Sequence, residues 1–168
     1  MVKKLSVAAV IGALYAAITL LCAPISFGVL QIRASEALCA FALISPAAIP
    51  GLTVGCFLAN LIGSSIVDAV LGSLATLLGT WLMYRFRARP LCGTLLNSLS
   101  NGIIVGLMLF FTSGLSADPG APGLAAGSLP TGPLACILWV LLGELISCCL
   151  LGLPLYKYLS KHSKDLGL

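Results

Sequence analysis

Apolar residues fill most of this chain and are interrupted at only a few charged or proline-rich positions. A helix needs about 20 residues to cross a bilayer, and such apolar stretches follow one another from the N-terminus almost to the C-terminus. We expect a single all-α integral membrane domain over residues 1–168, with 115–132 as an extracellular loop rich in Pro, Gly, Ala and Ser. The six expected spans are 5–24, 35–47, 50–64, 67–85, 91–114 and 133–156.

The second and third spans depend on how one long uncharged run is divided. Pro46, Pro50 and Gly51 lie in its middle, which favours two short helices around a tight turn, with one kinked helix as the alternative. Six spans with both termini in the cytoplasm place eight basic residues inside and only Arg33 outside, in agreement with the positive-inside rule. Five spans with the N-terminus outside would score seven against two.

Composition excludes several classes of protein. Apolar residues make up 60% of the chain and charged residues 8%, whereas soluble domains carry about 25% charge. The net charge of +4 forms no stripe that could follow nucleic-acid phosphates. The chain lacks a G-x-x-x-x-G-K-[ST] loop, so we expect no cofactor in it and an energy source on another polypeptide or in an ion gradient.

Catalysis and metal chemistry find little support in the residue types present. The single histidine, His162, lies in a lysine-rich tail, and no Ser/His/Asp or Cys/His set is available in the membrane. The seven cysteines show no C-x-x-C spacing, and we interpret them as small apolar fillers. Ligand capture or transport therefore fits better than an enzyme.

Small residues recur every four positions in the first span, in two adjacent rows. Such a face lets two helices approach closely in lipid, either within the domain or with a partner subunit. The rows are Ala9, Ala13 and Ala17 and, one position before them, Ala8, Gly12 and Ala16.

The few polar groups at membrane depth are the candidates for chemistry, because burying them is costly. Glu144 is the clearest, since it lies near the middle of the last span with no cation within a helical turn. Asn97 and Asn101 share one helical face, and each could bind a ligand or join two helices. Asn60 poses the same choice, and we favour a structural role there.

A polar group of residues, Gln31, Arg33 and Glu36, enters the second span. In a purely structural interpretation Ser35 caps the helix and Arg33 pairs with Glu36. Asp68 follows Ser65 at the spacing of a capping box, which favours a capping role over ligand binding.

Several of these segments resemble the QueT family over nearly the whole chain. The matching segments are Ala23-Pro-Ile-Ser-Phe-Gly, Gln31-Ile-Arg-Ala-Ser-Glu-Ala-Leu, Ile49-Pro-Gly-Leu, Leu58-Ala-Asn, Gly72-Ser-Leu-Ala-Thr-Leu-Leu, Asn97, and Gly143-Glu-Leu with Leu151-Gly-Leu-Pro-Leu. The resemblance implies a substrate-binding S component of an energy-coupling factor (ECF) transporter in the bacterial cytoplasmic membrane. It implies six helices, an outward-facing pocket for a queuosine precursor, and a T component that docks on Ala9, Ala13 and Ala17. It also implies two cytoplasmic ATPase subunits that consume ATP.

The ligand that the resemblance implies, 7-aminomethyl-7-deazaguanine or queuine, suits the polar residues. A guanine-type edge offers two parallel donors to one carboxylate, for which Glu144 is the candidate. The cationic amine needs a second acid, Glu36 or Asp68. The remaining ligand candidates are Asn97, Gln31 and Arg33 for the carbonyl and ring nitrogens, Phe27 and Trp139 for stacking, and Asn101 and Asn60 as further amides.

Other functions stay open at this point. An S component for another vitamin or purine-like ligand fits the same residues. A stand-alone secondary transporter could use Glu144 or Asp68 as a proton site, although the chain shows no convincing internal repeat. A small membrane enzyme is disfavoured by the lack of a catalytic cluster.

Overall fold

Helices account for all regular secondary structure in the part of the chain that the computed structural model describes, residues 2–27, 31–115 and 132–166. Residues 116–131 of the expected extracellular loop lie outside the described residues. The elements are α1 (Val2–Leu21), α2 (Ala23–Ser26), the 3-10 helix η1 (Ala34–Leu43), α3 (Ala48–Gly63), α4 (Ile66–Arg85), α5 (Pro90–Leu115), α6 (Pro133–Glu144), the π-helix η2 (Leu145–Gly152) and α7 (Leu153–Leu166).

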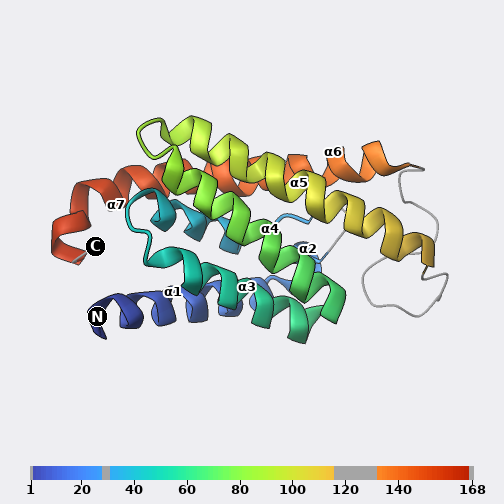
Figure 1. Ribbon diagram of the computed structural model, residues 1–168, viewed down its shortest axis with the longest axis horizontal. Coiled ribbons are helices and arrows are strands. Elements are labelled where there is room, and N and C mark those ends of the chain that lie inside the picture. Colours follow the sequence, from blue (N-terminus) through green and yellow to red (C-terminus); the bar gives the residue numbers. More distant parts are fainter. Residues whose placement is uncertain (1, 28–30, 116–131, 167–168) are drawn as a thin grey trace.

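The elements alternate in direction along the long axis of the molecule (Figure 1). The order is α1, η1, α3, α4, α5 and then the continuous column α6–η2–α7. Both ends of the chain and the α4–α5 turn lie at one end of the bundle, and the α3–α4 turn lies at the other (Figure 1). Arg87 and Arg89 occupy the α4–α5 turn, so basic residues gather at the end that holds the termini.

Within the described residues, four helical segments are long and apolar enough to cross a membrane, as in a membrane protein. These segments are Lys4–Leu21, Ile66–Arg85, Pro90–Thr112 and Pro133–His162. The other two apolar helices, η1 with 10 residues and α3 with 16, are shorter than a full span. The count of six spans and the cytoplasmic location of the termini therefore stay predictions.

The long uncharged run forms two helices, η1 and α3, joined by a turn at 44–47. Pro46 lies in this turn, and Pro50 lies in the first turn of α3, where its missing N–H removes no helical hydrogen bond. The 3-10 geometry of η1 rises about 2.0 Å per residue against 1.5 Å in an α-helix. Its ten residues thus reach as far as about 13 residues of α-helix.

The last helical column differs from the expected span 133–156. It continues through Tyr156 to Leu166, because the lysines and leucines that follow are good helix formers even though they are no longer uniformly apolar. The column also changes to π geometry over Leu145–Gly152, directly after Glu144. Stretches of π-helix are rare and are found frequently at functional sites.

Glycines let α1 and α3 pack backbone against backbone. A methyl group at Gly12 would lie 2.6 Å from the carbonyl oxygen of Gly51, and one at Gly55 would lie 2.9 Å from the Gly12 Cα. Ala8 and Gly12 are buried in this contact, while the adjacent row Ala9, Ala13 and Ala17 is exposed. The two rows of small residues therefore have different surroundings, one internal and one on the outer surface.

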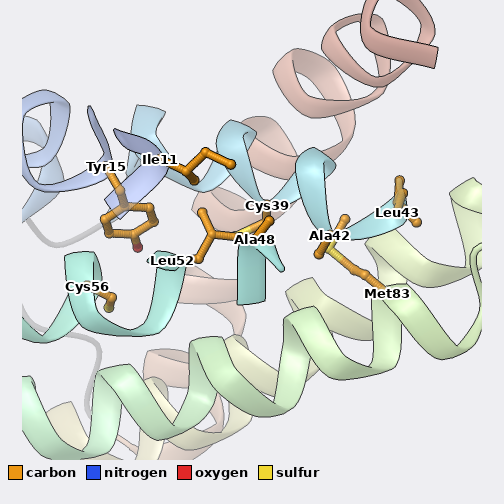
Figure 2. Close-up of a cluster of buried hydrophobic side chains, with 9 residues drawn as sticks. All are labelled: Ile11, Tyr15, Cys39, Ala42, Leu43, Ala48, Leu52, Cys56 and Met83. Atoms are coloured by element: carbon orange, nitrogen blue, oxygen red, sulfur yellow. The ribbon is translucent and has the colours of Figure 1, made fainter. Parts of the chain in front are cut away.

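The main apolar core surrounds η1, between α1, α3 and α4 (Figure 2). Tyr15 reaches from α1 into this core, and Met83 reaches it from α4. A second cluster joins α4, α5 and α6 through Ala75, Val105 and Val140. The polar residues described next lie beside these two clusters.

Candidate functional site

The polar cluster centres on two buried carboxylates from different parts of the chain. Glu36 in η1 is 1% exposed and Glu144 at the end of α6 is 3% exposed. One carboxylate oxygen of each residue and the Cys148 sulfur lie within 4.8 Å of one another. The packing of η1 against η2 thus brings together two acids that are 108 positions apart in the sequence.

Donors from three helices hold the Glu36 carboxylate. The Tyr15 hydroxyl of α1 donates to Oε1, and the Thr76 hydroxyl of α4 donates to the same oxygen at 3.5 Å. The Cys39 thiol donates to Oε2 at 3.0 Å. Glu36 is therefore fixed in one orientation by residues of α1, η1 and α4.

Glu144 has far fewer partners. Among the described residues its carboxylate accepts one hydrogen bond, from the Cys148 thiol at 3.6 Å. The Asn97 amide of α5 donates to the same sulfur at 3.1 Å, and the thiol also lies 3.7 Å from the Glu36 carbonyl oxygen. Cys148 thus connects both acids with α5, and Glu144 keeps acceptor capacity for another molecule.

Arg33 lies beside the two acids without pairing to either. Its Nη2 donates to the Gln31 side chain at 3.1 Å, and its Nη1 lies 4.0 Å from the Cys56 sulfur. The guanidinium also stands 5.8 Å from the centre of the Phe27 ring. The purely structural interpretation of residues 31–36 is wrong on two points. Arg33 forms no ion pair with Glu36 within the described residues. The Ser35 hydroxyl bonds to the Thr19 hydroxyl at 2.6 Å and does not cap η1.

The α3–α4 corner explains two further candidates as structural. Ser65 is the N-cap of α4 and accepts from the Asp68 backbone N–H at 3.1 Å, while the Ser64 hydroxyl donates to the Asp68 carboxylate. Asn60 donates to the Asp68 carbonyl oxygen at 3.0 Å. Ser65 therefore caps α4 at the position that the spacing predicted, the Asp68 carboxylate bonds to Ser64, and Asn60 fastens α3 to the start of α4.

The two asparagines of α5 are both buried. Asn97 reaches Cys148, and its carboxamide fits only because Gly79 on α4 has no side chain to occupy the same space. Asn101 lies one turn further along and is 2% exposed. Its Nδ2 has no hydrogen-bond partner in the described structure.

Unpartnered buried atoms gather on the residues that the sequence singled out. Leaving such an atom without a partner costs about 1–3 kcal/mol, so these atoms are candidates for contact with a bound molecule. In the described part of the chain they are Arg33 Nε, Asn60 Oδ1, Asn97 Oδ1 and Asn101 Nδ2, together with the hydroxyls of Ser26, Ser98 and Ser100.

Other expected site residues lie elsewhere. Trp139 is 40% exposed on the outer surface of α6, and nothing places it beside the carboxylates. Phe27 is half-buried and contacts Arg33. The structure therefore brings together Glu144, Glu36, Arg33, Gln31 and Asn97, with Phe27 at their edge.

Sequence reasoning missed several residues of this cluster. Tyr15 and Thr76 both donate to the Glu36 carboxylate. Three cysteines are more than apolar fillers, because their sulfur atoms make polar contacts in the cluster: Cys39, Cys56 and Cys148. The spacing of Cys148, four residues after Glu144, is the only signal that could have linked them, because residues four apart share a helical face.

This arrangement suits recognition of a planar polar molecule. It combines two carboxylates as acceptors, one guanidinium as donor and two amides that can do either.

A family comparison covers nearly the whole chain. The model of the family described as "QueT transporter" matches residues 5–161. The chain belongs to the QueT transporter family. The apolar helices of this QueT family member agree with a membrane location.

A curated relative gives a second comparison. The chain is 35% identical over 85 residues to a "Queuosine precursor transporter QueT" from Lactococcus lactis subsp. cremoris (strain MG1363). The aligned segment covers 47% of this chain. The match spans about half the length of that relative, 50%. No solved structure matches this QueT family member.

Proposed function

We propose that this QueT family member is the substrate-binding S component of an ECF-type importer for a queuosine precursor. It captures 7-aminomethyl-7-deazaguanine or queuine from the outer side of the bacterial cytoplasmic membrane. A T component and two cytoplasmic ATPases then move the ligand inward. Family membership and the name of the Lactococcus relative support the ligand class.

The observation that carries the proposal is the buried polar cluster with its unpartnered atoms. Polar groups at membrane depth are costly and are retained where they bind a substrate or one another. Here Arg33, Asn97 and Asn101 keep unpartnered atoms, and Glu144 accepts only one long thiol contact among the described residues. A deazapurine offers donors and acceptors along its edges that can satisfy these atoms.

The exposed row Ala9, Ala13 and Ala17 supports the partner side of the proposal. It is a smooth face on α1 that the described bundle leaves free, next to the row that packs on α3. Small residues at this spacing allow a second helix to approach closely in lipid. A T component helix is the occupant we propose.

Calorimetric titration of the purified, detergent-solubilised chain tests the proposal. We expect 7-aminomethyl-7-deazaguanine to bind without partner proteins or ATP, and guanine and riboflavin to bind weakly or not at all. Equal binding of guanine would favour a purine-like ligand in general. Absence of deazapurine binding by a folded sample would overturn the proposed substrate.

A proton-coupled carrier is the second candidate, favoured by the sparse hydrogen bonding of the buried Glu144 carboxylate. Proteoliposomes that contain this chain alone separate the two functions. Uptake driven by a proton gradient without ATPases would support the carrier and contradict the S component.

A further inference from the structure

Glu36 and Glu144 lie together in the buried cluster with a single cation among the described residues, Arg33, near them. The three ligand atoms of Glu36, Glu144 and Cys148 lie within 4.8 Å of one another. Arg33 is the basic residue nearest the cluster, yet its guanidinium bonds to Gln31 and forms no ion pair with either carboxylate within the described residues. Two carboxylates so close in a low-dielectric interior repel each other, and one guanidinium that pairs directly with neither leaves a negative charge that a ligand cation between them can balance.

A neighbouring side chain independently points to a missing molecule. The Asn97 carboxamide is directed at this cluster, since its Nδ2 donates to the Cys148 sulfur at 3.1 Å. Asn97 is 0% exposed, and its Oδ1, which lies against Gly79 of α4, has no partner. Arg33 beside the two acids is 3% exposed, and its Nε also has no partner. A buried donor in this situation is satisfied when an acceptor of a ligand lies against it.

The short distance between the Glu36 and Glu144 carboxylates limits which parts of a ligand they can contact. A 7-aminomethyl-7-deazaguanine carries its cationic amine on the five-membered ring and its N1–H and exocyclic amine on the far side of the six-membered ring. These two ends lie farther apart than the 4.8 Å that encloses the Glu36 and Glu144 oxygens. The two carboxylates therefore meet the same end of the ligand.

We infer that Glu36 and Glu144 act as one cation-binding pair that holds the protonated amine of the ligand between them. The inference rests on the proposed function in that the amine belongs to a deazapurine. It differs from the expectation from the sequence, in which Glu144 binds the guanine edge and Glu36 binds the amine. Arg33 Nε, which is buried and unpartnered, is left for a ring edge.

The two acids have unequal roles in this pair. Glu36 is held by Tyr15, Thr76 and Cys39 and provides a fixed negative charge. Glu144, bonded among the described residues only to a thiol at 3.6 Å, can turn toward the amine when it enters. The site consequently selects ligands by charge.

The test compares two ligands of the same shape, cationic 7-aminomethyl-7-deazaguanine and neutral 7-hydroxymethyl-7-deazaguanine, by calorimetry on the full chain in detergent. We expect the wild type to prefer the cation by at least about tenfold, the size expected for hydrogen bonds to a charged group. Glu36→Gln and Glu144→Gln should each reduce this preference, and the double variant should abolish it while still binding the neutral compound. Asp68→Asn is the matched control, a buried acid outside the cluster, and should keep the wild-type preference.

Each possible outcome decides the inference. Equal affinity of the wild type for the two compounds overturns the inference alone, and this measurement needs no variant to fold. A preference that persists in the double variant also overturns it. Binding that is lost with EDTA and restored by Zn²⁺ would show that a metal ion occupies the acid pair instead. Binding of neither compound overturns the proposed function, and the inference with it.

Discussion

At the scale of single residues, the two acids of the site differ in how firmly they are held. Three side-chain donors fix Glu36, and one of them, the Tyr15 hydroxyl, comes from α1. Glu144 lacks such support among the described residues. A residue like Tyr15 does not need to touch the ligand in order to affect binding, because it determines where the Glu36 charge stands.

Tyr15→Phe tests this positioning role. The variant removes one hydroxyl from a fully buried ring, so we expect ligand affinity to fall about three- to tenfold, the usual net effect of losing one hydrogen bond. Calorimetry on the purified chain measures the loss. Tyr158→Phe is the matched control, since Tyr158 is 62% exposed on α7, and it should bind as the wild type does. A Tyr15→Phe chain with unchanged affinity would remove Tyr15 from the site.

Ser65 offers the opposite case, a residue that acts on stability and not on binding. Its hydroxyl accepts the Asp68 N–H at the start of α4, and loss of such a cap costs about 1 kcal/mol. Ser65→Ala should therefore lower the thermal stability in detergent while leaving ligand affinity unchanged. Ser6→Ala, on an exposed serine of α1, should change neither. A loss of affinity in Ser65→Ala would extend the ligand site to the α3–α4 corner.

The candidate site was accessible from the sequence only in part. Glu36, Glu144 and Arg33 were predictable because charged residues in apolar segments are rare and costly. Tyr15, Thr76 and Cys148 are common residue types in membrane helices, and nothing local marks them. That they meet Glu36 and Glu144 depends on how η1 packs against α1, α4 and η2, which no single segment encodes.

At the scale of elements, α1 has two adjacent faces with separate tasks. Ala8 and Gly12 pack on the α3 backbone, and Ala9, Ala13 and Ala17 face outward. The sequence predicted both rows but left open whether they contact this domain or another subunit. The helix positions were predictable from apolar runs and prolines, whereas the 3-10 geometry of η1 and the π geometry of η2 arise from tertiary packing that overrides local preference.

Leucine substitutions in the two rows should therefore have different consequences. Gly12→Leu places a side chain against the Gly51 carbonyl, where a methyl carbon would already lie 2.6 Å away, so we expect a strongly destabilised chain. Ala13→Leu adds the same bulk on the exposed row and should keep stability and ligand binding but abolish uptake in cells that hold the partner proteins. Thermal unfolding, calorimetry and uptake measured on both variants check this. Uptake at the wild-type rate by Ala13→Leu would exclude this row as the partner surface.

At the scale of the whole molecule, the fold separates the site from the charged end. Glu36, Glu144 and Asn97 meet inside the bundle, while Arg87 and Arg89 occupy the turn at the end that holds both termini (Figure 1). The proposed function assigns ligand binding to this bundle and energy use to the partner ATPases. Under that proposal, we expect ligand binding and energy use to be separable properties.

Binding alone should stabilise the whole bundle, because the ligand joins η1, α5 and the α6–η2 junction. Ligand that binds only the folded state adds about 2.7 kcal/mol at a concentration of 100 times Kd, which should appear as a higher Tm for the chain without partners or ATP. Proteoliposomes with this chain alone should bind labelled 7-aminomethyl-7-deazaguanine but not accumulate it, and accumulation should require the T component, both ATPases and ATP hydrolysis. The Ala13→Leu variant provides the control, with the same rise in Tm and no accumulation. Accumulation by the chain alone would contradict this division, since the energy would then have to enter through the bundle itself.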